Sequence, residues 1–129
     1  MRLTTKTDYC LRILIFLQSH KGMHKIQKIA DTYQISKNHL SVAANKLSEL
    51  GYVISTSGPN GGIVFNPRFA EKTVADLVTA IEDFEMAECF NNKTNKCNLS
   101  SHCKLKSILK NATSSFVATL KNYKIKDLV

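Results

Sequence analysis

The stretch SKNHLSVAANKLSELG, residues 36–51, carries the clearest helical pattern in this sequence. Ser36 is a favoured N-cap, and Gly51 suits the end of a helix because it has no Cβ atom. Between them the apolar residues recur with the period of an α-helix, which predicts one buried face and one polar face that is free to meet a partner. The apolar residues are Leu40, Ala43, Ala44, Leu47 and Leu50.

Two helices are predicted ahead of this stretch. A helical apolar pattern over residues 11–17 predicts the first, which begins within residues 4–7 and ends before Gly22. Residues 34–35 form a brief turn that joins the second helix to Ser36, so two helices meet across a short turn. The second helix is shorter and has its apolar residues at Ile26, Ile29, Ala30 and Tyr33.

The pattern becomes strand-like after Gly51. Residues 52–55 and 63–65 flank the segment GPNGG, residues 58–62, which predicts a β-hairpin. Thr73 and Asp76 then have the spacing of a capping box at the start of a further helix. The order of helix, turn, helix and hairpin is that of a winged helix-turn-helix domain.

A long apolar stripe near the C-terminus follows a polar stretch, residues 83–100. We expect Ser100 or Ser101 to cap this last helix, which would place Cys103 in its first turn. A helix of about 20 residues is about 30 Å long, so we expect a second subunit to cover its apolar face, with packing against its own domain as the alternative. The stripe consists of Leu105, Ile108, Leu109, Ala112, Phe116, Leu120 and Tyr123.

The predicted fold is mainly α with a small β-hairpin, a winged helix-turn-helix domain followed by a long C-terminal dimerisation helix. We expect residues 1–82 to form the DNA-binding domain and residues 83–100 a cysteine-containing loop, with Cys103 just beyond it. Residues 101–129 would form the dimerisation helix and the tail. A chain of 129 residues can bury roughly two-thirds of its unfolded surface, so this fold needs no disulfide staples.

The charge distribution predicts a nucleic-acid partner. The formal net charge is +8, of which +5 lies in residues 1–67. The second helix of a helix-turn-helix enters the major groove, where Asn pairs with adenine and Lys reaches guanine, and the hairpin would lie along the backbone or in the minor groove. We therefore expect double-stranded DNA with palindromic half-sites, contacted by Lys28, Ser36, Lys37, Asn38, His39, Asn45, Lys46, Asn60, Gly61 and Gly62.

Several other protein classes are not expected. The longest apolar run, residues 13–17, is far shorter than the ~20 residues of a membrane-spanning helix, and residues 1–10 lack the pattern of a signal peptide. We therefore expect a cytoplasmic protein without a membrane partner, whose four cysteines are thiols, metal ligands or redox centres. No catalytic triad, phosphate loop or paired-carboxylate pocket is evident, so an enzyme is not expected.

Three cysteines lie close together in the sequence. Seven residues separate Cys89 from Cys97 and five separate Cys97 from Cys103. Structural zinc sites use CxxC-like pairs, whereas thiolates at irregular spacing can hold an iron–sulfur cluster. A fourth ligand must come from elsewhere, and Cys10 and Asp8 are the candidates. An oxygen ligand binds iron less tightly than a thiolate does, which would leave one iron open to small molecules.

Short motifs along nearly the whole chain form a specific combination. They are TDY at 7–9, SKNH at 36–39, LSELGYV at 47–53, NGGI at 60–63, CKLK at 103–106, SF at 115–116 and DLV at 127–129, together with the three clustered cysteines. With these motifs the sequence resembles the NsrR-type nitric-oxide-sensing repressors of the winged-helix iron–sulfur regulator superfamily, which also includes IscR.

This resemblance implies a homodimeric repressor that senses nitric oxide. Cys89, Cys97 and Cys103 would hold an iron–sulfur cluster, and Asp8 of the partner subunit would be its fourth ligand. The resemblance favours a 4Fe-4S cluster, with a 2Fe-2S cluster as the alternative. Reaction of nitric oxide with the cluster would release the repressor from its promoters.

Two other functions fit the same residues. A cluster-free regulator of the same fold would sense oxidation among the three thiols of Cys89, Cys97 and Cys103. A small iron–sulfur electron-transfer protein would use the cysteines without needing a recognition helix or a wing. Iron and sulfide content separates the first alternative, and operator binding separates the second.

Overall fold

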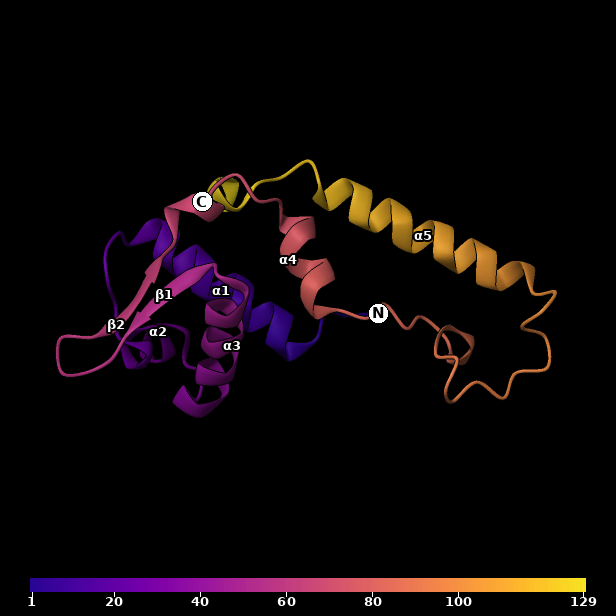
Figure 1. Cartoon of the computed structure of the whole chain (residues 1–129), viewed down its shortest axis with the longest axis horizontal. Coiled ribbons are helices and arrows are strands. Elements are labelled where there is room, and N and C mark those ends of the chain that lie inside the picture. The colour runs from indigo at the N-terminus through magenta and orange to yellow at the C-terminus, as the bar shows by residue number, and fades with distance from the viewer.

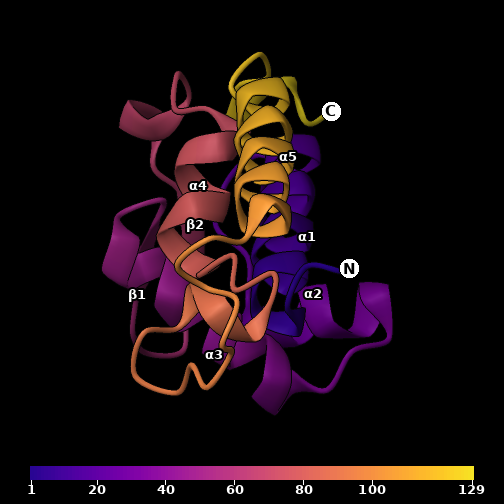
Figure 2. The ribbon, with the colours of Figure 1, turned by 90° about the vertical axis from the view of Figure 1, so that its right-hand side faces the viewer.

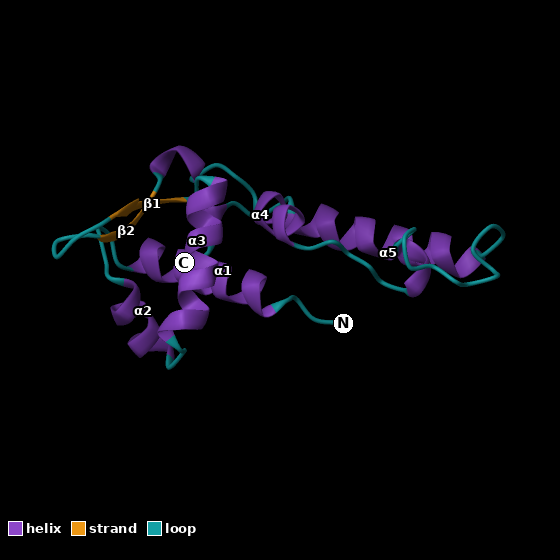
Figure 3. Ribbon diagram, turned by 60° about the horizontal axis from the view of Figure 1, so that its bottom comes forward, coloured by secondary structure: helices purple, strands orange, loops and turns teal.

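Helices dominate the structure, a computed structural model that describes residues 1–129, and a two-stranded sheet completes it (Figures 1 and 3). The helices and strands are α1 (Thr5–Ser19), α2 (Ile26–Tyr33), α3 (Lys37–Leu50), β1 (Val53–Thr56), β2 (Gly62–Phe65), α4 (Val74–Ile81) and α5 (Lys104–Leu120). Short 3₁₀ turns lie at Pro67–Phe69, Glu88–Phe90 and Ile125–Asp127. The mainly α fold class with a small hairpin is therefore confirmed.

The core lies where α1 crosses α3. Thr4 caps α1, because its Oγ1 accepts a hydrogen bond from the N–H of Thr7 at 3.3 Å. The apolar stripe of α1 and the predicted stripe of α3 face each other, and α2 covers their edge. The fully buried side chains of this core include Ile13, Leu14, Ile29, Leu40 and Leu47. The periodicity that predicted α3 thus marks the face that packs on α1.

The wing is held by more than its two strands. β1 and β2 pair antiparallel, with Val53 opposite Phe65 and Thr56 opposite Gly62. His24, just before α2, adds a bridge on the other side of β2, because its N–H and C=O both bond to Ile63, at 3.0 and 2.8 Å. No pattern in the sequence predicted this bridge between His24 and Ile63. The bridge fixes the base of the wing against the start of α2.

The C-terminal tail returns to the winged domain. Thr73 bridges to Lys124, and the N–H of Val74 donates to the carbonyl of Tyr123 at 2.8 Å. The N–H of Ile125 donates to the carbonyl of Lys72 at 2.8 Å, and the Ile125 side chain is completely buried. The tail therefore belongs to the core of the domain that begins the chain.

The last long helix contacts this core only through partly buried side chains, among them Phe116 and Leu120. α5 packs along α4 but has no buried residue, and it extends with the cysteine loop away from the wing (Figures 1 and 2). Its predicted start was wrong: α5 begins at Lys104 with Cys103 as its N-cap, because the hydroxyl of Ser100 bonds instead to the carbonyl of Cys97 at 2.9 Å. It ends at Leu120, so Tyr123 of the predicted stripe lies beyond it.

Candidate functional site

The helix-turn-helix is formed by α2, a tight turn and α3. Gln34 ends α2 in the left-handed conformation, with φ of 55°, and this turns the chain within two residues into Ser36. Ser36 caps α3 as predicted, because its Oγ accepts a hydrogen bond from the N–H of His39 at 3.4 Å. The first turn of α3 is exposed, and the N–H groups that Ser36 leaves unpaired there suit a phosphate.

Most of the predicted contact residues on the helices are exposed. Lys28 lies on α2, and the remaining exposed ones, Ser36, Lys37, Asn38, His39 and Asn45, belong to α3 or its cap. Lys46 differs, because it is half-buried and its Nζ lies 3.6 Å from Oε1 of Glu49. Asn38 and Asn45 are seven residues apart and so share one face of the helix.

At the wing tip, the predicted contact residues Gly61 and Gly62 differ from Asn60 in their exposure. Asn60 is exposed, whereas Gly61 is buried and Gly62 half-buried. A Cβ atom on Gly61 would lie 2.0 Å from the carbonyl oxygen of Thr56, and one on Gly62 would lie 2.5 Å from that of His24. These two glycines therefore shape the wing, and Asn60 is the side chain that it presents.

Two further residues of this surface were not predicted. The Nζ of Lys25 donates to the carbonyl oxygen of Gly58 at 2.8 Å and so ties the start of α2 to the wing. Val42 is exposed on the outer face of α3. The bond from Lys25 joins residues 33 positions apart, which no local pattern reveals, while Val42 is detectable as an apolar residue outside the buried repeat of α3.

The predicted cluster ligands lie at the far end of the molecule. Cys89 is buried in the turn Glu88–Phe90, while Cys97 and Cys103 are partly exposed, and none of the three forms a disulfide. Hydrogen bonds within the loop hold it, such as the one from the N–H of Cys97 to Oδ1 of Asn95 at 2.9 Å. The chain does not bring any three His, Cys, Asp or Glu side chains into one group able to hold a metal ion.

The chemistry of these donors nevertheless fits an iron–sulfur group. Three free thiols in a polar loop are soft ligands, and Cys103 lies at the positive end of the α5 dipole, which favours an anionic group. A cavity of about 370 Å³ adjoins Cys89, and Lys106 and Lys110 of α5 help to line it. One chain thus offers three sulfur donors beside positive charge, and they are not gathered around a common centre.

The two candidates for the fourth ligand have different surroundings in α1. Both carboxylate oxygens of Asp8 accept hydrogen bonds from Arg12, each at 3.0 Å, and the pair is partly exposed. These hydrogen bonds raise the pKa of Arg12. Cys10 is completely buried, its Sγ lies 3.4 Å from the carbonyl oxygen of Ala43, and burial raises its pKa to about 12. Cys10 is therefore part of the core between α1 and α3.

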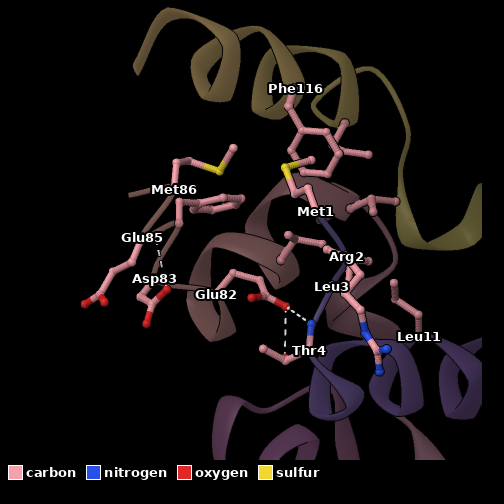
Figure 4. A pocket seen from close by; sticks show the side chains of 14 residues that line it. Met1, Arg2, Leu3, Thr4, Leu11, Glu82, Asp83, Glu85, Met86 and Phe116 are labelled. Atoms are coloured by element: carbon pink, nitrogen blue, oxygen red, sulfur yellow. Dashed lines mark hydrogen bonds between the residues drawn. The ribbon is translucent and has the colours of Figure 1, made fainter. Parts of the chain in front are cut away.

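The start of α1 is bonded to the start of the cysteine loop. The N–H and the hydroxyl of Thr4 both donate to Oε1 of Glu82, at 2.7 and 2.9 Å (Figure 4). Burial raises the pKa of Glu82, but hydrogen bonds from Thr7 and Thr4 outweigh this and hold it below the usual value. The helix that carries Asp8 and the loop that carries the three thiols therefore share a hydrogen-bonded junction.

A largely apolar cavity of about 840 Å³ opens beside this junction (Figure 4). It lies between the N-terminal segment, the end of α4 and the inner face of α5, and Leu3, Phe84, Met86 and Phe116 are among its lining residues. The apolar face of α5 is thus only partly covered by its own chain.

None of the helices is long and apolar enough to cross a membrane.

Comparison with known proteins identifies the family. The Rrf2 family model, described as an iron-dependent transcriptional regulator, matches residues 3–129. The HTH-type transcriptional regulator NsrR of Shouchella clausii strain KSM-K16 is 39% identical over 132 residues, which covers 100% of this chain and 89% of that protein. NsrR of Bacillus subtilis strain 168 is 40% identical, with coverage of 100% and 90%. Both relatives are regulators of transcription and not enzymes.

Solved structures of the same fold have lower sequence identity to this chain. The T. potens IscR structure has a TM-score of 0.75 at 20% identity and covers 99% of this chain and 85% of that chain. Staphylococcus aureus CymR has a TM-score of 0.73 at 20% identity, with coverage of 97% and 95%. The chain is thus a non-enzymatic transcriptional regulator that belongs to the Rrf2 family.

Proposed function

We propose that this protein is a homodimeric repressor that binds palindromic operator DNA and leaves it when nitric oxide reacts with an iron–sulfur cluster. One observation carries this proposal: three free cysteines occupy a loop remote from the recognition helix, in a chain about 40% identical over its whole length to regulators named NsrR. The DNA-reading and signal-receiving residues are separate, as a sensor that controls DNA binding requires.

In this proposal Cys89, Cys97 and Cys103 hold the cluster, and Asp8 of the partner subunit completes it. A 4Fe-4S cluster is favoured, as the resemblance to NsrR-type regulators implies, and the oxygen ligand would leave one iron more open to nitric oxide. The bound cluster supplies the site at which nitric oxide reacts. Asp8 is partly exposed and paired with Arg12, so its carboxylate can turn toward a partner without crossing the core.

The unfilled apolar surface supports dimerisation through α5. Leu105 and Ile108 are 58% and 61% exposed on a helix without any buried residue. A second copy of α5 offers a matching apolar face, and coiled-coil-like packing would cover both. We accordingly propose residues 1–82 as the DNA-binding domain, residues 83–100 as the cluster loop and residues 101–129 as the dimerisation segment.

α1 connects the proposed signal to the DNA. It carries Asp8 near its start, shares the junction between Thr4 and Glu82 with the cysteine loop, and packs against α3 where the two helices cross. Half-sites on opposite arms of an operator lie about 34 Å apart. A ligand bond from Asp8 of the partner subunit would fix α1 across the dimer, and its loss would let the two α3 helices leave that spacing.

The test begins with protein purified without oxygen. We expect bound iron and acid-labile sulfide, visible absorption, and promoter affinity that falls by a factor of about 5 to 150 after nitric oxide is added. Fluorescence anisotropy with promoter DNA measures the affinity. A colourless protein that cannot be reconstituted, or an affinity that nitric oxide leaves unchanged, would contradict the proposal.

Cysteine variants provide matched controls. Cys97→Ala should lose the cluster, whereas Cys10→Ala should keep it, because Cys10 lies in the core. Asp8→Ala should lose the cluster faster than the wild type while changing the stability of the cluster-free protein by less than about 1 kcal/mol, since its ion pair with Arg12 is partly exposed. Equal cluster retention in Asp8→Ala would exclude Asp8 as a ligand.

A cluster-free thiol sensor is the second candidate. It is favoured by the partial exposure of Cys97 and Cys103, since accessible thiols can be oxidised. Protein without iron or sulfide that loses DNA binding on mild oxidation, and regains it with a reductant, would support this candidate.

A further inference from the structure

Val42 is an exposed apolar side chain in the middle of the recognition helix. It is 54% exposed, whereas Leu40, Ala43 and Leu47 of the same helix are at most 1% exposed. The buried face of α3 is therefore complete without Val42. The side chain contributes little to the core of its own chain.

Helix stability does not account for Val42 either. A β-branched residue in the interior of a helix is less favourable than Ala, Lys or Gln. Single exposed apolar residues are common on protein surfaces, so exposure alone does not indicate a ligand. The position of Val42 does indicate a ligand. Val42 lies four residues after Asn38 and three before Asn45, and these spacings place the three side chains on one helix face. Both asparagines are exposed.

The major groove offers one apolar group to such a side chain. This group is the C5-methyl of thymine, and its partner adenine is the base that Asn recognises with two hydrogen bonds. Four residues span about 6 Å along a helix axis, less than two base-pair steps. A valine between two asparagines thus matches neighbouring A·T pairs, and the net charge of +5 in residues 1–67 matches the phosphates around them.

We propose that Val42 determines operator specificity by packing against the methyl group of a thymine in each half-site. This inference rests on the proposed binding to operator DNA, with α3 as the helix in the major groove, and it adds the base that α3 selects. Asn38 or Asn45 then contacts the adenine of the same or the adjacent pair.

The test combines a protein change with the removal of the methyl group from DNA. The full-length protein, purified without oxygen, first selects its operator from a randomised duplex library. Each thymine of the selected site is then replaced by uracil, which lacks only the C5-methyl. We expect one uracil position in each half-site to weaken wild-type binding by about fourfold, the value of one buried methyl group, and the pair of positions by about fifteenfold.

Val42→Ala provides the second arm. It should bind the thymine operator as weakly as the wild type binds the doubly substituted uracil operator, and it should lose no further affinity with uracil. This non-additivity is the signature of a direct contact. Alanine is the best helix former, so the variant should retain its circular dichroism spectrum and melting temperature.

Two results would overturn the inference in distinguishable ways. If uracil weakens Val42→Ala as much as the wild type at every position, Val42 does not contact a thymine methyl, although operator binding stands. If the library yields no enriched sequence, operator recognition itself fails, and the role of Val42 fails with it. Val42→Thr, which keeps one of the two methyl groups, should lie between the wild type and Val42→Ala.

Discussion

The helices of the winged domain and helix α5, here called the α5 arm together with the cysteine loop, differ in how far their apolar faces are buried. α1 and α3 place their apolar faces against each other, and several of their side chains are completely inaccessible. α5 is the longest helix of the chain and buries no residue. The hydrophobic core of the winged domain is therefore complete within one chain, whereas α5 has an apolar face that its own chain covers only in part.

The largest expected difference between the two halves concerns stability. Leu47→Ala should lower the free energy of unfolding by about 2 to 5 kcal/mol, because it leaves a cavity in a fully buried site. Ile108→Ala, an equally simple truncation on α5, should change the stability of the dilute monomer by less than about 0.5 kcal/mol. Urea denaturation at low protein concentration measures both. Comparable losses would mean that α5 is buried within its own chain.

Self-association, in contrast to stability, should depend mainly on the exposed face of α5. Ile108→Lys places a charge on the uncovered face of α5, so we expect the dimer dissociation constant to rise at least about tenfold. Sedimentation velocity over a concentration series reports the constant. Val42→Ala is the matched exposed-residue control and should leave it unchanged. An unaltered dimer in Ile108→Lys would place the interface elsewhere.

Alkaline pH should weaken the winged domain through a buried group. The pKa of Cys10 is raised to about 12 by burial, whereas in the unfolded chain it is near 9. Above pH 9 the unfolded thiol ionises while the folded one stays protonated, so stability falls as pH rises, by at most about 1.4 kcal/mol per pH unit. Urea denaturation between pH 8 and 10 should show this slope, which Cys10→Ala should reduce. An unchanged slope would assign the loss to other groups.

The smallest effect is expected where the arm rejoins the winged domain. Ion pairs and hydrogen bonds with Lys124 and Lys126 lower the pKa of Glu71 to about 2. This contribution is present above pH 4.5 and is lost as pH falls toward 2. Glu71→Gln should remove it and speed hydrogen exchange at the amide of Ile125, with little change in global stability. Exchange as slow as in the wild type would mean that the buried side chain of Ile125 suffices.

Local patterns in the sequence were sufficient for much of the fold. The caps Ser36 and Thr73, the apolar period of α3 and the glycine-rich hairpin each depend on residues a few positions apart, and all were confirmed. The bridge from His24 to Ile63 joins segments 39 positions apart, and the docking of Ile125 is likewise non-local. Such pairings depend on tertiary structure and leave no periodic pattern.

The candidate site was predictable to a similar degree. Helical period alone placed Asn38 and Asn45 outward, whereas the collisions that Gly61 and Gly62 avoid require the positions of neighbouring carbonyl groups. Ser100 is a good cap in isolation, but its hydroxyl donates to the carbonyl oxygen of Cys97, and Cys103 is the N-cap of α5 instead. Competition between local and helical hydrogen bonds decided that boundary.

The bridge between Thr73 and Lys124 closes residues 73–124 into one large loop that contains α4, the cysteine loop and α5. This bridge holds the C-terminal end of α5 close to the start of α4, while the cysteine loop joins the other end of α5 to the end of α4. A change in the cysteine loop would therefore reach the winged domain by two routes, through α4, which contacts α1, and through the C-terminal tail. Deleting the last residues of the chain, including Lys124, would release the C-terminal end of α5 from the winged domain. A change in the cysteine loop would then reach that domain through α4 alone.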